Sequence, residues 1–270
     1  MLNKPVVLLI SMSPLWPISN ILWLSLIFLL ASALTKVGNL AGPGWMLFGI
    51  YWMGQPGYYL SIGDYFNAGL TIAAGLLCVY MAGIILSKRC QTKAFQWASY
   101  AAAVCGIVYF PFAQVEILKD WLISQTALIT IHLLWAFSVP ASLQSWNVMA
   151  LNGRSVEIIL ACTAIESIAL FVGVIISVKA PPLRKFTALA VSTIVIYSLN
   201  IVRNAFVMAA YGQGWFGDDS FMVAHNIIAK AGSTVALLAI AYFVFTLLPE
   251  LLNLIDSLGS ELKNPRRGRS

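Results

Sequence analysis

Long apolar stretches recur along this chain, and they constrain its fold more than any other feature. A helix that crosses a membrane needs ~20 mainly apolar residues. We assign such spans to residues 20–36, 45–62, 67–86, 95–112, 161–178, 186–210 and 222–248. Of the 270 residues, 60% are hydrophobic and only 10% are charged, values that exclude an ordinary soluble domain. The sequence therefore predicts an all-α polytopic membrane protein, with residues 1–270 forming a single integral membrane domain.

Helix breakers lie before the first of these spans and inside the second. Pro14 and Pro17 precede the first span, so we expect its helix to begin after them, at residue 20. The span at residues 45–62 contains Gly54, Pro56 and Gly57, which together predict an interruption.

Basic residues indicate the orientation, because cytoplasmic loops of membrane proteins are enriched in Lys and Arg. They gather in two short loops and in a tail at residues 249–270: Lys88, Arg89 and Lys93; Lys179, Arg184 and Lys185; Lys263, Arg266, Arg267 and Arg269. We place all three segments on the cytoplasmic side. This placement accounts for the net charge of +6, so no nucleic-acid partner is expected.

The apolar stretch at residues 121–138 decides the number of crossings. The basic loops on either side of it share one face of the membrane only when this marginally long stretch does not cross. We therefore predict seven spans plus an amphipathic helix at the outer interface, with eight spans as the alternative. Beyond it, residues 146–151 and 155–160 flank Asn152-Gly153, a pair that favours a short β-hairpin.

Three residues that are rare inside spans lie at one predicted depth. In the seven-span topology Cys162 is at the outer end of its helix, and His225 begins the last span from the outside. Arg203 lies ~26 Å up a helix that starts at residue 186, close to the outer boundary of a core ~30 Å thick. Ionisable residues inside a membrane are costly, so they are functional candidates.

The three side chains have the chemistry of acyl transfer. A thiolate attacks a carbonyl carbon, and a neighbouring His or cation lowers the thiol pKa. His225 can accept the thiol proton and return it to the leaving group. Arg203 offers fixed donors to an oxyanion or a substrate carbonyl.

Each of these residues also has a structural interpretation. Cys162 alone fits a packing residue, and Arg203 alone fits a side chain that reaches the interface. His225 alone fits a helix-entry residue bonded to Asp219 or Ser220. The four cysteines show no metal-ligand or disulfide spacing, so no metal and no cofactor is expected.

Charged neighbours are supporting candidates. A continuous helix would place Glu166 one turn deeper than Cys162 on the same face. Glu166 and Asp219 could then orient Arg203 or His225. Lys230, which is unusual in a span, either pairs with Glu166 or lines the site.

Three short motifs, in order and on successive spans, resemble the exosortase/archaeosortase family, and most of all its archaeosortase members. They are Ala161-Cys162-Thr163, Asn200-Ile201-Val202-Arg203-Asn204 and Ala224-His225-Asn226. The likeness covers most of the chain. Two departures are Ala164, where the family usually has Gly, and Glu166.

The resemblance implies a thiol protease and transpeptidase in the cell membrane, with its active site at the extracytoplasmic face. Its substrates would be exported surface proteins, such as S-layer glycoproteins, that end in a Pro-Gly-Phe-type motif, a hydrophobic span and a basic tail. Cys162 would form a thioester, Arg203 would stabilise the oxyanion or position the substrate, and His225 would act as acid and base. Asn200 and Asn204 would support them. A lipid-derived amine or alcohol would then resolve the thioester.

Two other classes of protein stay open. In a transporter or channel, Arg203, Glu166 and Lys230 would line a pathway, although transporters typically show inverted repeats with paired broken helices. In a non-catalytic membrane scaffold, the polar residues would pair structurally. The sequence predicts no particular oligomeric state.

Overall fold

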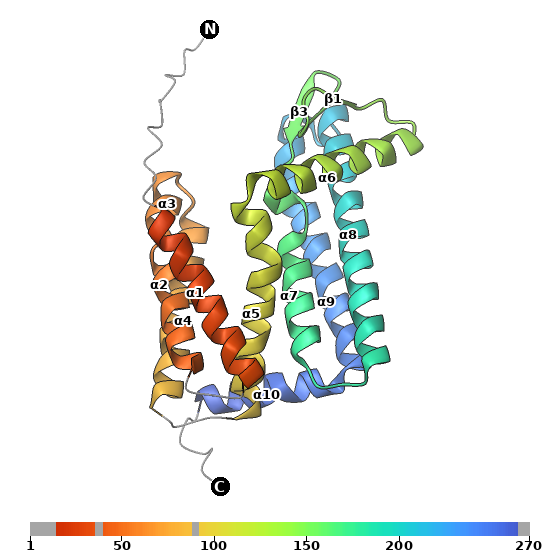
Figure 1. Cartoon of the computed structure of the whole chain (residues 1–270). Coiled ribbons are helices and arrows are strands. Elements are labelled where there is room, and N and C mark those ends of the chain that lie inside the picture. Colours follow the sequence, from red (N-terminus) through yellow and green to blue (C-terminus); the bar gives the residue numbers. More distant parts are fainter. Residues whose placement is uncertain (1–14, 36–39, 88–91, 264–270) are drawn as a thin grey trace. The chain divides into compact units, whose positions relative to one another are not determined.

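The computed structural model describes residues 15–35, 40–87 and 92–263 of the chain (Figure 1). They fall into two compact units, unit 1 up to Gln91 and unit 2 from Thr92. Five of the basic residues used to predict the orientation lie outside the described residues: Lys88, Arg89, Arg266, Arg267 and Arg269.

Apolar helices of membrane-spanning length confirm the predicted class. Among the described residues, four helices are long and apolar enough to cross a membrane: Tyr65–Leu86, Glu116–Ala136, Pro182–Gln213 and Met222–Leu247. Ser19–Thr35 and Ile165–Ser177 are shorter apolar helices. The chain is therefore a multi-pass α-helical membrane protein, while the number of crossings stays a prediction.

Unit 1 contains helices α1 (Leu15–Thr35), α2 (Ala41–Met53), α3 (Pro56–Ser61) and α4 (Tyr65–Leu86). Helix α2 packs against both α1 and α4. The buried Ser25 hydroxyl of α1 donates a hydrogen bond to the Gly44 carbonyl of α2 at 2.9 Å, which joins the two backbones closely.

The structure tests both predictions about helix breakers in unit 1. The interruption of the second span is confirmed, because α2 ends at Met53 and α3 begins with Pro56. The predicted start of the first helix at residue 20 is wrong, because α1 begins at Leu15. Pro17 falls in the first turn of α1, where a helix does not need the N–H that proline lacks.

Unit 2 carries the candidate residues. Its elements are α5 (Lys93–Gln114), α6 (Glu116–Ala136), β1 (Ser142–Leu143), β2 (Val148–Leu151), β3 (Arg154–Glu157), the 3₁₀ turn η2 (Leu160–Cys162), α7 (Ile165–Ser177), α8 (Pro182–Gln213), the 3₁₀ turn η3 (Gly217–Asp219), the π-helix η4 (Met222–Ala229), α9 (Lys230–Leu247) and α10 (Pro249–Lys263). Helices α5, α7, α8 and α9 run alongside one another, whereas α6 and α10 lie across opposite ends (Figure 1). We call these the hairpin end and the α10 end.

Helix α10 joins the starts of two long helices at one end of unit 2. Its Glu261 accepts a hydrogen bond from Thr92, just before α5. Its Glu250 pairs with Arg184, in the first turn of α8, at 2.8 Å. The chain therefore leaves the α10 end at Thr92 and is back at the same end by Arg184. This return agrees with the predicted placement of two basic segments, at Lys93 and Arg184, on one side.

The orientation of α6 explains how the chain returns. Four apolar side chains spread along α6 belong to one buried cluster, to which α8 contributes only Ala205, Met208 and Ala209, about one turn; the four are Ile123, Ala127, Ile131 and Leu134. Helices that ran alongside each other would share a longer contact. Helix α6 therefore crosses the end of α8 (Figure 1). Its length and composition would also fit a span, so its place at the outer interface stays a prediction.

The predicted β-hairpin is confirmed. Strands β2 and β3 pair antiparallel, with Leu151 opposite Arg154. Asn152 and Gly153 between them both have positive φ, at 53° and 78°, as a tight two-residue turn requires. The Arg154 guanidinium donates to the Tyr211 carbonyl at 2.5 Å, and the Asn152 amide donates to the Gly212 carbonyl at 3.2 Å. The hairpin therefore caps the end of α8.

Candidate active site

Cys162 does not lie in the helix that the sequence predicted for it. It ends the 3₁₀ turn η2, and α7 begins only at Ile165. The break occurs at Ala164, whose φ of 63° is left-handed. The placement of Glu166 one turn below Cys162 on a common helix is therefore wrong.

Two amides of α8 fix the backbone of Cys162. The Cys162 carbonyl accepts hydrogen bonds from Asn200 Nδ2 at 2.6 Å and from Asn204 Nδ2 at 2.9 Å. The two asparagines are four residues apart, so they share one face of α8. The Cys162 side chain is partly buried beside the cluster that joins α6, the hairpin and α8.

Arg203 lies on the same turn of α8 as the two asparagines. Its side chain is partly buried and lines a pocket of about 670 Å³ in unit 2. The Arg203 Nε atom is buried and has no hydrogen-bond partner among the described residues. A buried donor without a partner is costly, which makes Arg203 a functional candidate.

His225 reaches this region from the π-helix η4, which packs against α8. Its ring stacks on Phe221, with centroids 5.1 Å apart and planes tilted by 9°. The positive charges of Arg203 and Lys230 lie close enough to interact electrostatically with the His225 ring. Short π-helices often occur at functional sites, and nothing in the sequence indicates this one.

Three further candidate residues, Glu166, Asp219 and Lys230, lie in different environments. Glu166 is exposed and accepts a long hydrogen bond, 3.4 Å, from Tyr109 of α5. Asp219 is exposed in η3. Lys230 lines the pocket with Arg203, and among the described residues it forms no ion pair with Glu166.

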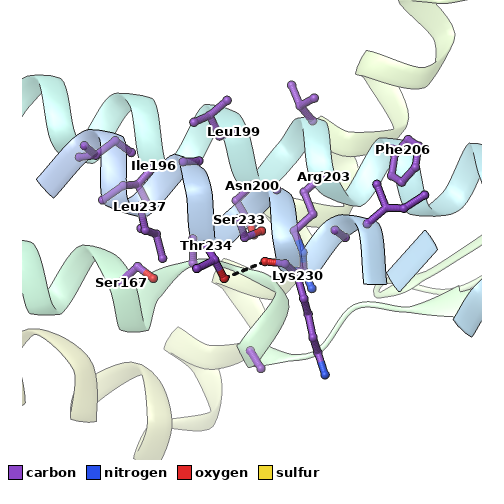
Figure 2. Close-up of a pocket in the computed structure, with 18 residues that line it drawn as sticks. Ser167, Ile196, Leu199, Asn200, Arg203, Phe206, Lys230, Ser233, Thr234 and Leu237 are labelled. Atoms are coloured by element: carbon purple, nitrogen blue, oxygen red, sulfur yellow. Dashed lines mark hydrogen bonds between the residues drawn. The ribbon is translucent and has the colours of Figure 1, made fainter. Parts of the chain in front are cut away.

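The pocket lies between α8, α9 and the start of α7. Arg203 and Lys230 lie toward one end of it, and Ile196 and Leu237 lie toward the other (Figure 2). The Thr234 hydroxyl donates to the Lys230 carbonyl at 2.9 Å. Cys162 is thus hydrogen-bonded to the turn of α8 that carries Arg203, and His225 lies on η4, which packs against α8. No hydrogen bond joins these three side chains to one another among the described residues.

These features define a class: a multi-pass helical membrane protein with a thiol, a guanidinium and an imidazole around one end of its helices. The family model for the transmembrane exosortase matches residues 10–245, and the chain belongs to this exosortase family. It is 28% identical to archaeosortase A of Haloferax volcanii over 250 residues, which cover 79% of this chain and 82% of that protein. It is 26% identical to archaeosortase A of Natronomonas pharaonis, over 82% of this chain and 79% of that protein. No solved structure matches it.

Proposed function

We propose that this protein is a membrane-embedded cysteine transpeptidase of the archaeosortase type. It cleaves a C-terminal sorting signal of the Pro-Gly-Phe type from exported surface proteins. It then transfers the shortened protein to a lipid acceptor. Membership of the exosortase family supports the class of activity, and the archaeosortase A relatives support the subgroup.

The observation that carries the proposal is the pair of hydrogen bonds from Asn200 and Asn204 to the Cys162 carbonyl. They explain why the motif around Arg203 contains these two amides: they hold the Cys162 turn against the turn of α8 that carries the guanidinium. Cys162 also lies two residues before the N-cap of α7.

The reaction proceeds in two acyl transfers. The Cys162 thiolate attacks the scissile carbonyl carbon, and Arg203 stabilises the negative charge that develops on its oxygen. The C–N bond breaks, the amine leaves with a proton from His225, and a thioester remains on Cys162. An amine or hydroxyl of the lipid then attacks the thioester. The C–S bond breaks, and the lipid's proton passes to His225, so the enzyme returns to its starting state.

The proposed orientation places the hairpin end of unit 2 on the extracytoplasmic side. The basic residues at the α10 end would then face the cytoplasm. A substrate helix can lie in the membrane with its scissile bond at the outer boundary, level with Arg203. The basic tail of the sorting signal would remain on the cytoplasmic side of the membrane.

Replacing the nucleophile tests the mechanism. We expect Cys162→Ser, expressed in membranes with a signal-bearing surface protein, to abolish C-terminal processing while the protein accumulates normally. Cys105→Ser is the matched control, because Cys105 is a partly buried thiol of α5 that is not among the residues proposed to react. Mass spectrometry of the wild type with a signal-bearing peptide should find an acyl adduct on Cys162.

The outcome also separates the alternatives. A transporter or a scaffold would tolerate Cys162→Ser. Processing that persists in this variant, at the level of Cys105→Ser, would refute the thiol mechanism.

A further inference from the structure

Two cations share the pocket without a negative partner. Arg203 and Lys230 both line it, and none of its described lining residues is acidic. Among the described residues, neither cation forms an ion pair, and the buried Arg203 Nε has no hydrogen-bond partner. Uncompensated positive charge beside a buried donor favours an anionic ligand.

The pocket continues as an apolar hollow away from the cations. A second pocket of about 380 Å³ is lined by residues of α7, α9 and α10, including Phe171, Val244 and Ile255. The two pockets share Ser167, Thr234 and Leu237 as lining residues, so they adjoin. The result is a groove along α7 and α9 that begins at two cations and ends among apolar side chains at α10.

We propose that this groove binds a phosphate-bearing membrane lipid. Its phosphate lies between Arg203 and Lys230, and one apolar chain follows α7 and α9 toward α10. Lys230 is then a positioning residue that holds the headgroup level with Cys162. The assignment of this lipid as the acyl acceptor rests on the proposed function, whereas its binding does not.

The charges along the groove favour a lipid over a substrate helix. Both cations lie at one end of the groove, and its other end is lined by apolar side chains. This distribution matches a molecule with one charged end and an apolar chain, whereas the proposed substrate helix is apolar along its whole span.

Lipid retention by the purified full-length chain tests this site. Native mass spectrometry would compare dioleoylphosphatidic acid with dioleoylglycerol, which has the same chains and no phosphate. We expect the wild type to retain the phosphatidic acid on the order of 10-fold more tightly, and Lys230→Gln to lose most of that preference. Ser167→Leu, at the junction of the two pockets, should weaken retention of both lipids.

Control variants keep the result interpretable. Lys119→Gln removes a cation from α6 that does not line the groove, and it should bind like the wild type. Melting temperatures of all variants report whether each is folded. Cys162→Ala forms no thioester and should retain the lipid, so binding is read independently of catalysis.

Several outcomes would overturn the lipid site. These are equal retention of the two lipids by the wild type, an unchanged preference in a folded Lys230→Gln, and displacement of the lipid by millimolar inorganic phosphate alone. The site would also be overturned if Lys230→Gln weakened the binding of a signal-bearing peptide and left lipid binding unchanged. In any of these cases, processing by the wild type would still stand as support for the proposed function.

Discussion

Removing the amides that hold Cys162 would measure how much its fixed position contributes to the reaction. We consider Asn200→Ala, Asn204→Ala and the double variant. Both amides donate to one carbonyl oxygen, at 2.6 and 2.9 Å. Asn204 is 5% exposed, so water does not readily replace the bond that it makes.

The expected losses follow from the shared acceptor. Each single variant leaves the Cys162 carbonyl with one donor, so we expect a loss of about 0.5–1 kcal/mol in transition-state stabilisation, roughly 2- to 5-fold in rate. The double variant leaves a carbonyl without a donor, which costs about 2–3 kcal/mol. The two effects are therefore coupled by about 1 kcal/mol, as expected for residues with a common partner.

The assay is the kcat/KM for thioester formation with a signal-bearing peptide, converted to free energy for each variant. Asn253→Ala is the control, because Asn253 is an exposed amide on α10, at the opposite end of unit 2. Strictly additive losses would refute the shared-carbonyl reasoning. So would a single variant as inactive as Cys162→Ser, because the side chain would then act on the substrate and not through the Cys162 backbone.

Three further predictions concern stability and are read from unfolding in detergent. Ala164→Gly should raise the free energy of unfolding by up to about 1 kcal/mol, because left-handed backbone costs an alanine more than the extra freedom of glycine in the unfolded chain. Gly173→Ala should lower it by about 1–3 kcal/mol, because a Cβ on α7 would lie 2.6 Å from the Ala101 carbonyl oxygen of α5. The pKa of Asp64, the N-cap of α4, is lowered by hydrogen bonds from the Asn67 backbone and side chain. The stability that this cap contributes is therefore full above the unfolded pKa, near 4, and is lost as pH falls through the lowered value. Asp64→Asn should remove that part of the pH dependence.

Features set by local chemistry could be predicted from the sequence. Pro56 cannot continue the hydrogen-bond pattern of α2, so the break between α2 and α3 was visible in the residues. Asn152 and Gly153 accept the positive φ of a tight turn, so the hairpin was visible too. The long apolar helices of unit 2 follow from composition and length alone.

The local structure around Cys162 could not be predicted, because distant residues determine it. Nothing in the run from Cys162 to Glu166 prohibits a continuous helix, and Ala164 favours one. The two amides of α8 instead hold the Cys162 carbonyl, and Ala164 takes a left-handed conformation before α7 begins. One indication came from the family resemblance: the family usually has glycine, which accepts a left-handed conformation, where this chain has Ala164.

Two more elements, η4 and α10, could not be predicted from the sequence, for different reasons. The π-helix η4 has an apolar composition that an α-helix would share, and its wider turn shows only in the backbone. The sequence predicts a basic tail at residues 249–270, and its charged residues obscure the helical spacing of α10. Leu251, Leu254 and Leu258 nevertheless recur at helical intervals, and they pack against the cluster formed by α5, α7, α8 and α9.

Helix α8 is held at both of its ends. Arg184 ties its first turn to Glu250 of α10, and the hairpin ties its last turns through Tyr211 and Gly212. The 32 residues of α8 form a helix ~48 Å long, in which Arg203 lies ~32 Å from Pro182 along the axis. This length is fixed by the protein, whereas hydrocarbon thickness differs by several Å between membranes. Arg203 therefore lies at a fixed distance from the α10 end, and in the proposed orientation a thicker or thinner bilayer shifts the lipid headgroups relative to it.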